Sequence, residues 1–331
     1  MNENPETKSE KNFWQDTVEC WHRLPNKFFF FGLLLAWLAL FQFWGNAILG
    51  YVHTPSLFSW LSNAYNNPNS DDSHGDLIPL IVIFIFWWKR NELLALPLKM
   101  WWPGFLIFIA ALALHIFGFL IQQPYFSIVA LFAGIWGLMG MAWGRDWLRR
   151  SMFPFCLFIF SIPLGQRGQV ITFPLQQLVS FLTEKCAHIL GIDVIRHGTQ
   201  LFDPSGTYGY EVAAACSGIK SLAVIFLIAV TYGFISLRSK WLRLLLMILA
   251  PPFAILGNLL RMLLIIVAAS MGGQSAGNYV HEGCPIHLPF NLPLIGNEIA
   301  VVNLLPYVPA ILGCLLIGRW LEKREAKKSA A

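Results

Sequence analysis

The sequence predicts an all-α protein, a polytopic integral membrane bundle of about eight transmembrane helices with a small outer cap between the fifth and the sixth. Of its 331 residues 56% are hydrophobic and only 12% are charged, whereas an ordinary soluble domain is about 25% charged. Runs rich in Leu, Ile, Phe and Trp recur from Phe28 to Gly318, several of them near the roughly 20 residues that a helix needs to cross a bilayer. These runs are evenly apolar and do not alternate as barrel strands do, so helices are expected.

The predicted transmembrane domain covers residues 28–318. Residues 1–27 are polar and of mixed charge, without the small-residue cleavage site of a signal peptide, and are expected to form a short cytoplasmic tail. Residues 319–331 form a second, basic cytoplasmic tail. The second and fifth predicted spans are short and would need flanking residues. The eight spans are residues 28–49, 77–88, 102–121, 125–143, 152–164, 213–235, 242–268 and 300–318.

The basic residues predict the orientation of these spans. Most of the 23 Lys and Arg residues fall in the two tails and in alternate connections, which places both termini in the cytoplasm by the positive-inside rule. They are Lys8, Lys11, Arg23, Lys27, Lys89, Arg90, Lys99, Arg145, Arg149, Arg150, Arg238, Lys240, Arg243, Arg319, Lys323, Arg324, Lys327 and Lys328. Three others fall in one outer segment, at Arg167, Lys185 and Arg196, and two fall inside spans, at Lys220 and Arg261.

The outer segments between spans five and six hold most of the polar residues. Residues 173–190 form an amphipathic stretch that is expected to lie at the interface as a helix, whether as a packed surface helix or as a guide for substrate. Residues 191–211 alternate and carry turn-forming residues, which predicts a small β-hairpin-like cap. Asp71, Asp72 and Asp76 precede the second span and are expected to solvate a loop.

Two predicted spans that run in opposite directions carry candidate reactive residues at the same depth in the membrane. Arg261 lies 19 residues beyond Leu242, which places it about 28 Å from the cytoplasmic side at 1.5 Å per residue. Cys216 and Lys220 lie at the start of the sixth span, which enters from that same outer side. His281 follows in the next outer segment. A thiol, a guanidinium and an imidazole are therefore expected to converge at the outer face.

These residue types suit acyl transfer. Unpaired N–H groups at a helix beginning favour a thiolate, and Lys220 lies one turn after Cys216. An imidazole could accept the thiol proton, while a guanidinium holds a developing oxyanion. Each residue also has a structural alternative. The cysteine could be a small packing residue, Arg261 could snorkel to the interface, and His281 could be a surface histidine.

At these residues the chain resembles the exosortase/archaeosortase family. The resemblance rests on Glu-Val-Ala-Ala-Ala-Cys-Ser-Gly-Ile-Lys-Ser from Glu211, on Gly-Asn-Leu-Leu-Arg-Met from Gly257, and on His281 followed by Gly283. Supporting matches are Ser-His-Gly-Asp-Leu-Ile-Pro from Ser73 and residues 191–198, so that roughly residues 71–283 are covered. The cysteine motif is the most specific of these segments, and a lone histidine is the least specific.

The resemblance implies a bacterial inner-membrane cysteine transpeptidase. Its partners would be secreted proteins with a PEP-CTERM-like tail, made of a sorting motif, a hydrophobic helix and a basic cluster. Cys216 would attack the motif and form an acyl-thioester, which a lipid or envelope acceptor would resolve. Arg261 would donate a proton or stabilise the oxyanion, and His281 would act as base or transition-state stabiliser. Supporting roles fall to Ser217, Lys220, Asn258 and His74; Asn258 could equally bond a neighbouring helix, and His74 could cap the second span.

Other functions remain open at this stage. A polytopic glycan ligase or polymerase would not require Cys216, and an intramembrane protease would differ only in letting water resolve the thioester. A transporter would need a polar path across the membrane, whereas the intramembrane charges here gather at one side. The six cysteines form no CxxC pair, which argues against a zinc site or a dithiol redox centre, and no motif for a metal or organic cofactor appears. The net charge of +5 is explained by the distribution of the basic residues across the membrane, so no nucleic acid is expected. Cys186 and Cys284 both fall on the outer side, where pairing would be permitted.

Overall fold

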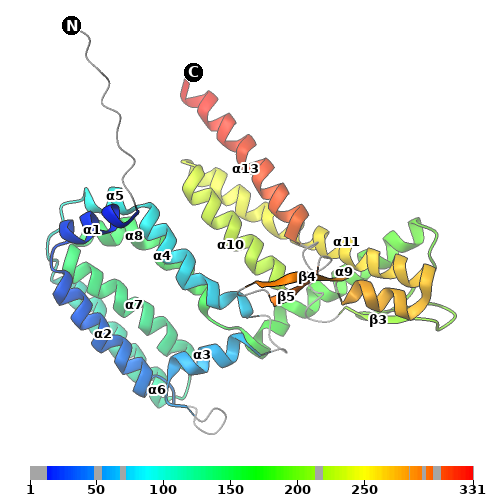
Figure 1. The fold of residues 1–331 in the computed structure, drawn as a ribbon, viewed down its shortest axis with the longest axis horizontal. Helices are drawn as coiled ribbons and strands as arrows, with labels where there is room; N and C mark the ends of the chain where they lie inside the picture. The colour runs from blue at the N-terminus through cyan, green and yellow to red at the C-terminus, as the bar shows by residue number, and fades with distance from the viewer. Residues whose placement is uncertain are drawn as a thin grey trace. The chain divides into compact units, whose positions relative to one another are not determined.

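The structure is a computed structural model that describes residues 13–47, 54–67, 72–212, 219–282, 284–292, 296–300 and 307–330. It is mostly helical, with two small antiparallel sheets, which confirms the predicted helical class (Figure 1). The chain divides into two compact units. The first comprises residues 1–67 and 75–163, and the second comprises residues 68–74 and 164–331.

The first unit is built only of helices within its described residues. Its α-helices are α1 (Phe13–Arg23), α2 (Lys27–Trp44), α3 (Leu57–Tyr65), α4 (Ile78–Trp88), α5 (Arg90–Leu94), α6 (Pro103–Leu120), α7 (Pro124–Trp143) and α8 (Arg145–Cys156). The 3-10 segment η2 (Leu157–Ser161) follows α8, and η1 (Ser73–Leu77), whose first two residues are assigned to the second unit, precedes α4. Helices α4, α6 and α7 have a proline in their first turn, where its missing N–H costs no intrahelical bond.

Small residues let the helices of the first unit approach closely. A Cβ on Gly104 of α6 would lie 2.6 Å from the backbone nitrogen of Met141, so only glycine fits where α6 meets α7. The Trp37 ring of α2 fills the space beside Gly134 of α7, and its indole N–H donates to the carbonyl of Leu131 at 3.0 Å. Close backbone contact of this kind is how apolar helices associate where no water drives them together.

The second unit combines helices with both sheets. Its helices are η3 (Gly165–Gly168), α9 (Gln169–Ile189), α10 (Ile219–Ser236), α11 (Lys240–His281) and α13 (Tyr307–Ala330), and α10, α11 and α13 pack on one another. Helix α9 contains nearly all of the predicted amphipathic stretch 173–190, ending one residue short at Ile189, and confirms that this stretch is a helix. A second sheet, β4 (Pro285–Leu292) with β5 (Gly296–Ala300), was not predicted. Ala300, the predicted start of the eighth span, belongs to β5, and α13 begins at Tyr307.

The predicted cap is present as a three-stranded antiparallel sheet. It contains β1 (Ile195–His197), β2 (Gln200–Phe202) and β3 (Gly209–Glu211), with β2 in the centre. Arg196 faces Leu201 in the first pair, and Leu201 faces Tyr210 in the second. The sheet therefore extends the predicted hairpin by one strand, which leads toward the segment that contains Cys216.

Within the residues that the structure describes, four helices are long and apolar enough to cross a membrane. They are α2, α6, α7 and α11, and shorter apolar helices occupy residues 74–88 and 222–236. The chain is therefore a helical membrane protein, while the count of eight spans stays a prediction. The fifth predicted span, residues 152–164, is divided between the end of α8 and η2, with Pro154 inside α8. A proline inside a helix removes one backbone hydrogen bond and disturbs the preceding turn.

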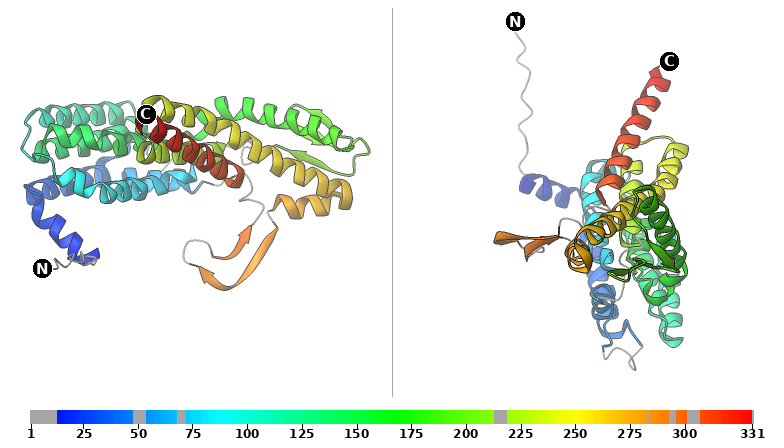
Figure 2. Two further views of the ribbon diagram at one scale, coloured as in Figure 1. Left: turned by 90° about the horizontal axis from the view of Figure 1, so that it is seen from above. Right: turned by 90° about the vertical axis from the view of Figure 1, so that its right-hand side faces the viewer.

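Helix α11 is a hairpin of two helical segments. Its 42 residues would extend about 63 Å as one rod, twice the thickness of a bilayer core. Gly272 and Gly273 leave the helical conformation, and Gly273 has a φ of 69°, which glycine adopts without steric cost. The chain turns there, and the last residues of α11 return alongside the preceding segment, as the views in Figures 1 and 2 agree.

The part of α11 that follows Arg261, which we call the distal part, packs against α9 and the three-stranded sheet. A cluster of buried side chains joins α9, the three-stranded sheet and α11, and its members include Val179, Ala187, Leu201, Tyr210, Met262, Ile265, Ile266 and Ala269. In the part of α11 that precedes Arg261, which we call the proximal part, Leu246, Ala250 and Ala254 pack instead with α10 and α13. The same helix thus contributes to two hydrophobic clusters, and Arg261 lies in sequence between the residues of the first cluster and those of the second.

Candidate active site

The predicted nucleophile lies outside the described residues. Cys216 and Ser217 fall in the undescribed segment 213–218, between β3 and α10. Lys220 lies in the first turn of α10. The structure therefore describes the elements on either side of the cysteine motif, and the remaining predicted residues can be located in relation to those elements.

Arg261 and His281 come together through the chain reversal in α11. They are 20 residues apart in sequence, and the Arg261 guanidinium donates a hydrogen bond from Nη2 to the main-chain carbonyl of His281 at 3.2 Å. Both residues are partly buried. A straight helix would separate them by about 30 Å at 1.5 Å per residue. The Gly272–Gly273 turn therefore brings the Arg261 guanidinium to the main chain at His281, while the convergence of both side chains with Cys216 stays a prediction.

Tyr210 of β3 joins this pair from the sheet. Its ring stacks on the His281 imidazole, with centroids 6.2 Å apart and planes inclined by 25°. Its hydroxyl lies 3.0 Å from the carbonyl oxygen of Gln274 and 3.2 Å from Oδ1 of Asn278. Tyr210 is buried, and burial raises the pKa of its phenol. The ring therefore stays neutral at physiological pH and acts as a contact surface and hydrogen-bond donor.

A short polar network extends from Tyr210 along the returning segment. The Gly209 N–H donates to Oε1 of Gln274 at 3.0 Å, and the Gln274 amide donates to Oδ1 of Asn278, also at 3.0 Å. Gly277 lies between these residues, where a Cβ would come within 2.1 Å of the Tyr210 hydroxyl. Strand β3, which ends five residues before Cys216, is thus hydrogen-bonded to the segment that ends at His281.

The sequence prediction missed Tyr210, Gln274 and Asn278. Gln274 and Asn278 are four residues apart, so they lie on one face of a helix, and that spacing was the available signal. Tyr210 gave no such signal, because nothing in a single sequence indicates which strand residue will meet a helix 64 residues away.

Asn258 is buried inside α11. Its side-chain amide donates to the carbonyl of Ala254 in the same helix at 3.1 Å. It lies one turn before Arg261, on the side of the helix that packs against protein. A direct part in the reaction stays a prediction for Asn258, while its hydrogen bond satisfies a polar group within the packed helix.

Asp72 differs from its prediction, because it does not solvate a loop. The side chain is 4% exposed, and its two carboxylate oxygens accept from the backbone N–H groups of Leu164 and Gly165 at 2.8 and 2.9 Å. These donors lie where η3 begins, so the carboxylate caps a helical turn. His74 is partly buried in η1, two residues away.

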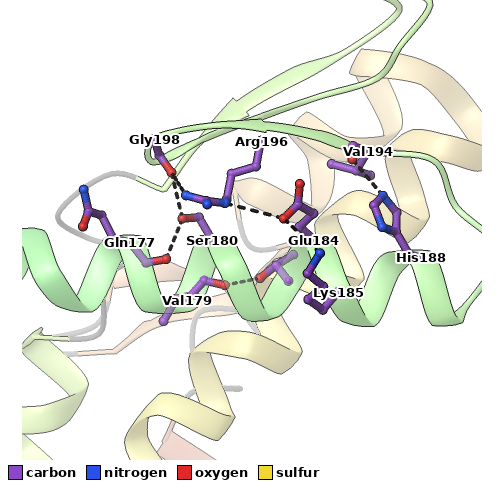
Figure 3. Close-up of polar contacts among 10 residues, drawn as sticks. Gln177, Val179, Ser180, Glu184, Lys185, His188, Val194, Arg196 and Gly198 are labelled. Atoms are coloured by element: carbon purple, nitrogen blue, oxygen red, sulfur yellow. Dashed lines mark hydrogen bonds and ion pairs between the residues drawn. The ribbon is translucent and has the colours of Figure 1, made fainter.

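A second group of polar contacts holds the three-stranded sheet on α9, as Figure 3 shows. Arg196 of β1 donates to the carbonyl of Gly198 at 2.9 Å and lies 3.6 Å from the Glu184 carboxylate. Ser180 of α9 donates to the same Gly198 carbonyl at 3.1 Å, and a ring nitrogen of His188 lies 2.9 Å from the carbonyl of Val194. These contacts fix the position of the sheet from which Tyr210 projects.

The described thiols and carboxylates form no further reactive cluster. Cys186 and Cys284 are free thiols, so the pairing that their location would permit is not formed. Across the described ranges, no three His, Cys, Asp or Glu side chains come close enough together to hold a metal ion. The predicted site residues that the structure describes are thus Arg261 and His281, and the cysteine motif lies in the undescribed segment between β3 and α10.

The fold and this site define a class of protein, a polytopic helical membrane protein with an arginine–histidine pair beside a small sheet. A family model described as "Transmembrane exosortase (Exosortase_EpsH)" matches residues 60–284, well over half of the chain, and the protein belongs to this family. No curated protein and no solved structure is similar enough to count as a match. Family membership gives the protein a general role as a membrane transpeptidase in protein sorting.

Proposed function

We propose that this exosortase is a cysteine transpeptidase at the outer face of a bacterial inner membrane. It cleaves the C-terminal sorting tail of secreted proteins and transfers them to an amine on a lipid or envelope component. The observation that carries the proposal is the hydrogen bond from Arg261 to His281, because it joins the two family-type residues at one place. The family match over residues 60–284 includes both of them and Cys216.

The proposed first step forms an acyl-thioester. His281 accepts the thiol proton of Cys216, and the thiolate sulfur attacks the backbone carbonyl carbon of the sorting motif. A C–S bond forms and gives a tetrahedral intermediate. When this intermediate collapses, the C–N bond breaks and the leaving amine takes the proton from the imidazole. Arg261 stabilises the oxyanion, since a guanidinium does not lose its proton in a protein and cannot serve as a base.

The second step returns the free enzyme. An acceptor amine attacks the thioester carbon, a new C–N bond forms, and the C–S bond breaks. His281 takes a proton from the attacking amine and returns it to the Cys216 sulfur. Lys220, Ser217, Asn258 and His74 are proposed as supporting residues. The substrate would be a secreted protein with a PEP-CTERM-like tail whose own helix lies beside the bundle.

The proposed orientation places this chemistry at the outer boundary. Lys240 begins α11 among the basic residues assigned to the cytoplasm, and Arg261 follows 21 residues later, about 32 Å along a helix. That distance matches a hydrocarbon core of roughly 30 Å. Both termini are then cytoplasmic, with residues 1–27 and 319–331 as the tails of a transmembrane domain of residues 28–318.

The proposal is tested by co-expressing the enzyme with a substrate that has the three-part tail. Wild type should shorten the substrate, while Cys216→Ala and Cys216→Ser should leave it uncut at equal membrane expression. Cys186→Ala and Cys284→Ala are matched controls, because both remove free thiols from the same unit, and both should process normally. Normal processing by Cys216→Ala would show that the nucleophile is wrong.

The chemical form of the product's new C-terminus distinguishes transfer from simple hydrolysis. Adding an amine acceptor should give a substrate whose new C-terminus carries that amine, detected by mass spectrometry. A free carboxylate with every acceptor offered would favour a plain protease with the same nucleophile.

A further inference from the structure

Helix α1 presents an apolar stripe that the described residues of its own unit leave exposed. Trp14, Val18 and Trp21 recur at helical spacing and are 70%, 53% and 41% exposed. The helix buries no residue completely. Two tryptophans and a valine left open to water are costly, at roughly 25 cal/mol for each Å² of apolar surface. The stripe therefore requires a partner.

Contacts on the other side of α1 fix its rotation. The Asp16 carboxylate accepts from the Arg90 guanidinium at 2.6 Å, at the start of α5. Arg90 lies in turn over the Trp87 ring, 4.4 Å from its centroid, and the Phe13 ring lies 4.9 Å from that of Trp87. The ion pair, the cation–π contact and the Phe13–Trp87 ring contact hold α1 on the end of α4, so Trp14 and Val18 stay exposed.

The apolar stripe continues onto a membrane span. The Trp21 ring lies 5.4 Å from the Phe31 ring and 6.2 Å from the Phe28 ring, both on α2. Helix α2 is a candidate span, and Phe28 is 78% exposed on it. Because a span shows its exposed apolar side chains to lipid, the surface that begins on α2 and runs through Trp21 onto α1 is a lipid-facing surface.

Basic groups border this surface. The Lys27 ammonium donates to the Trp21 carbonyl at 2.8 Å and lies 5.1 Å from the centroid of the Trp21 ring. Arg23, also exposed, ends the helix. An apolar stripe with tryptophan at its centre and cations at its edge is the pattern of a helix that lies in the headgroup region.

We propose that α1 lies along the membrane surface, with Trp14, Val18 and Trp21 among the acyl chains and with Arg23 and Lys27 against anionic phospholipid headgroups. The partner is a bilayer, because the stripe is continuous with α2, whose membrane contact is already required by its sequence. The Asp16–Arg90 ion pair sets which face of α1 enters the lipid. This interfacial contact does not depend on the transpeptidase proposal.

The test places a photo-reactive residue on each face of α1 in the full-length protein. Val18→p-benzoyl-phenylalanine lies on the stripe, and Glu19→p-benzoyl-phenylalanine is the matched control, exposed and rotated by about 100°. The protein is placed in nanodiscs of phosphatidylethanolamine and phosphatidylglycerol and irradiated, and lipid adducts on the α1 peptide are measured by mass spectrometry. At least ten times more adduct is expected from position 18 than from position 19.

Other outcomes overturn the proposal. Equal adduct at both positions, or none at either, would mean that α1 stands in water, and a crosslink from position 18 to a polypeptide would identify a protein partner instead. Trp14→p-benzoyl-phenylalanine repeats the test at a second stripe position in case the first variant folds poorly. Replacing phosphatidylglycerol with phosphatidylcholine should lower the yield at position 18 several-fold, and an unchanged yield would overturn the anionic part.

Discussion

The two units each hold a histidine among apolar helices, and the two sites differ in how they are built. His115 of α6 is 4% exposed, and its Nδ1 lies 3.0 Å from the Ser127 hydroxyl of α7. The Trp44 backbone gives the same ring a further partner. His281 is only partly buried, stands at the end of a reversed helix, and receives a hydrogen bond from a guanidinium on its carbonyl.

This difference suggests different roles for the two histidines. A buried polar group costs stability unless it is hydrogen-bonded, and neighbours in the bundle supply such bonds to His115. At His281 a helix break, a returning segment and a sheet together bring a guanidinium to the main-chain carbonyl and a tyrosine ring to the imidazole. A site of that kind is expected to control turnover, whereas the His115 site is expected to control folding.

The largest expected effect comes from Arg261. Arg261→Ala should lower substrate processing by about 10²–10³-fold, the usual loss when an oxyanion donor is removed. Arg261→Lys should recover little, because an ammonium lacks the planar fork of a guanidinium. The rate of substrate shortening at equal membrane expression measures both.

His115→Ala is the counterpart in the first unit. It should lower the unfolding temperature in detergent, since a buried hydroxyl then loses its partner at a cost of about 1–3 kcal/mol. Processing per folded molecule should stay near wild type. A strong loss of processing with normal stability would break the distinction between the two histidines.

Glycine-to-alanine replacements test how closely the helices pack in each of the two units. Gly277→Ala would place a Cβ 2.1 Å from the Tyr210 hydroxyl and 2.8 Å from the Ala269 side chain, and overpacking of this kind costs about 1–3 kcal/mol. It should lower processing, because the returning segment that ends at His281 must shift. Gly118→Ala, 2.6 Å from Phe126 in the first unit, should lower thermal stability instead.

A neutral control for these replacements is Gly32→Ala, where a Cβ would meet nothing within 4 Å. It should leave processing and unfolding temperature unchanged. If all three variants behave alike, the close approach at Gly277 has no special part in the site.

A smaller effect is expected at Tyr210. Tyr210→Phe keeps the ring on His281 but removes the hydroxyl that reaches Gln274 and Asn278, and a hydrogen bond of this kind contributes about 1 kcal/mol. Processing should fall by about fivefold, since 1.4 kcal/mol corresponds to a factor of ten. The ring itself matters more, so Tyr210→Leu should be slower than Tyr210→Phe.

Tyr208 provides the matched control for Tyr210. It is equally buried and lies 6.1 Å away between ring centroids, but its hydroxyl has no hydrogen-bond partner in the part of the chain that the structure describes. Tyr208→Phe should therefore process like wild type. Equal losses in Tyr208→Phe and Tyr210→Phe would show that the hydroxyl network does not position the site.

The smallest expected effect is at the exposed turn of the sheet. The Ser205 and Thr207 hydroxyls donate to the Asp203 carboxylate and hold its pKa below the ordinary value. Because the pKa is lower in the folded state than in the unfolded state, this turn adds stability above the unfolded pKa, and that stability is lost as the pH falls through the folded pKa. Asp203→Asn should therefore lower the unfolding temperature slightly at pH 7, and by less at acidic pH below the ordinary carboxyl pKa.

An equal difference in unfolding temperature between wild type and Asp203→Asn at neutral and acidic pH would contradict the role of the Asp203 hydrogen bonds. The comparison of the two proteins at each pH removes the contribution of other titrating groups, since these are shared.

The sequence by itself determined the class of the fold and the identity of the candidate residues. Apolar runs fix helices because a backbone in lipid must bond within its own segment, and Arg261 stands out because a cation in such a run is costly. The amphipathic α9 and the small sheet followed from local periodicity. The Cys216 motif predicts a nucleophile, and it lies outside the residues that the structure describes.

Only the tertiary structure decided how the site is assembled. The burial of Asp72 as a cap and the contact between Tyr210 and His281 both depend on residues far apart in sequence. Periodicity reports which face of an element is apolar, but it does not report which other element covers that face. That choice is made by packing between elements, so a single sequence could predict the parts of this site but not the contacts that join them.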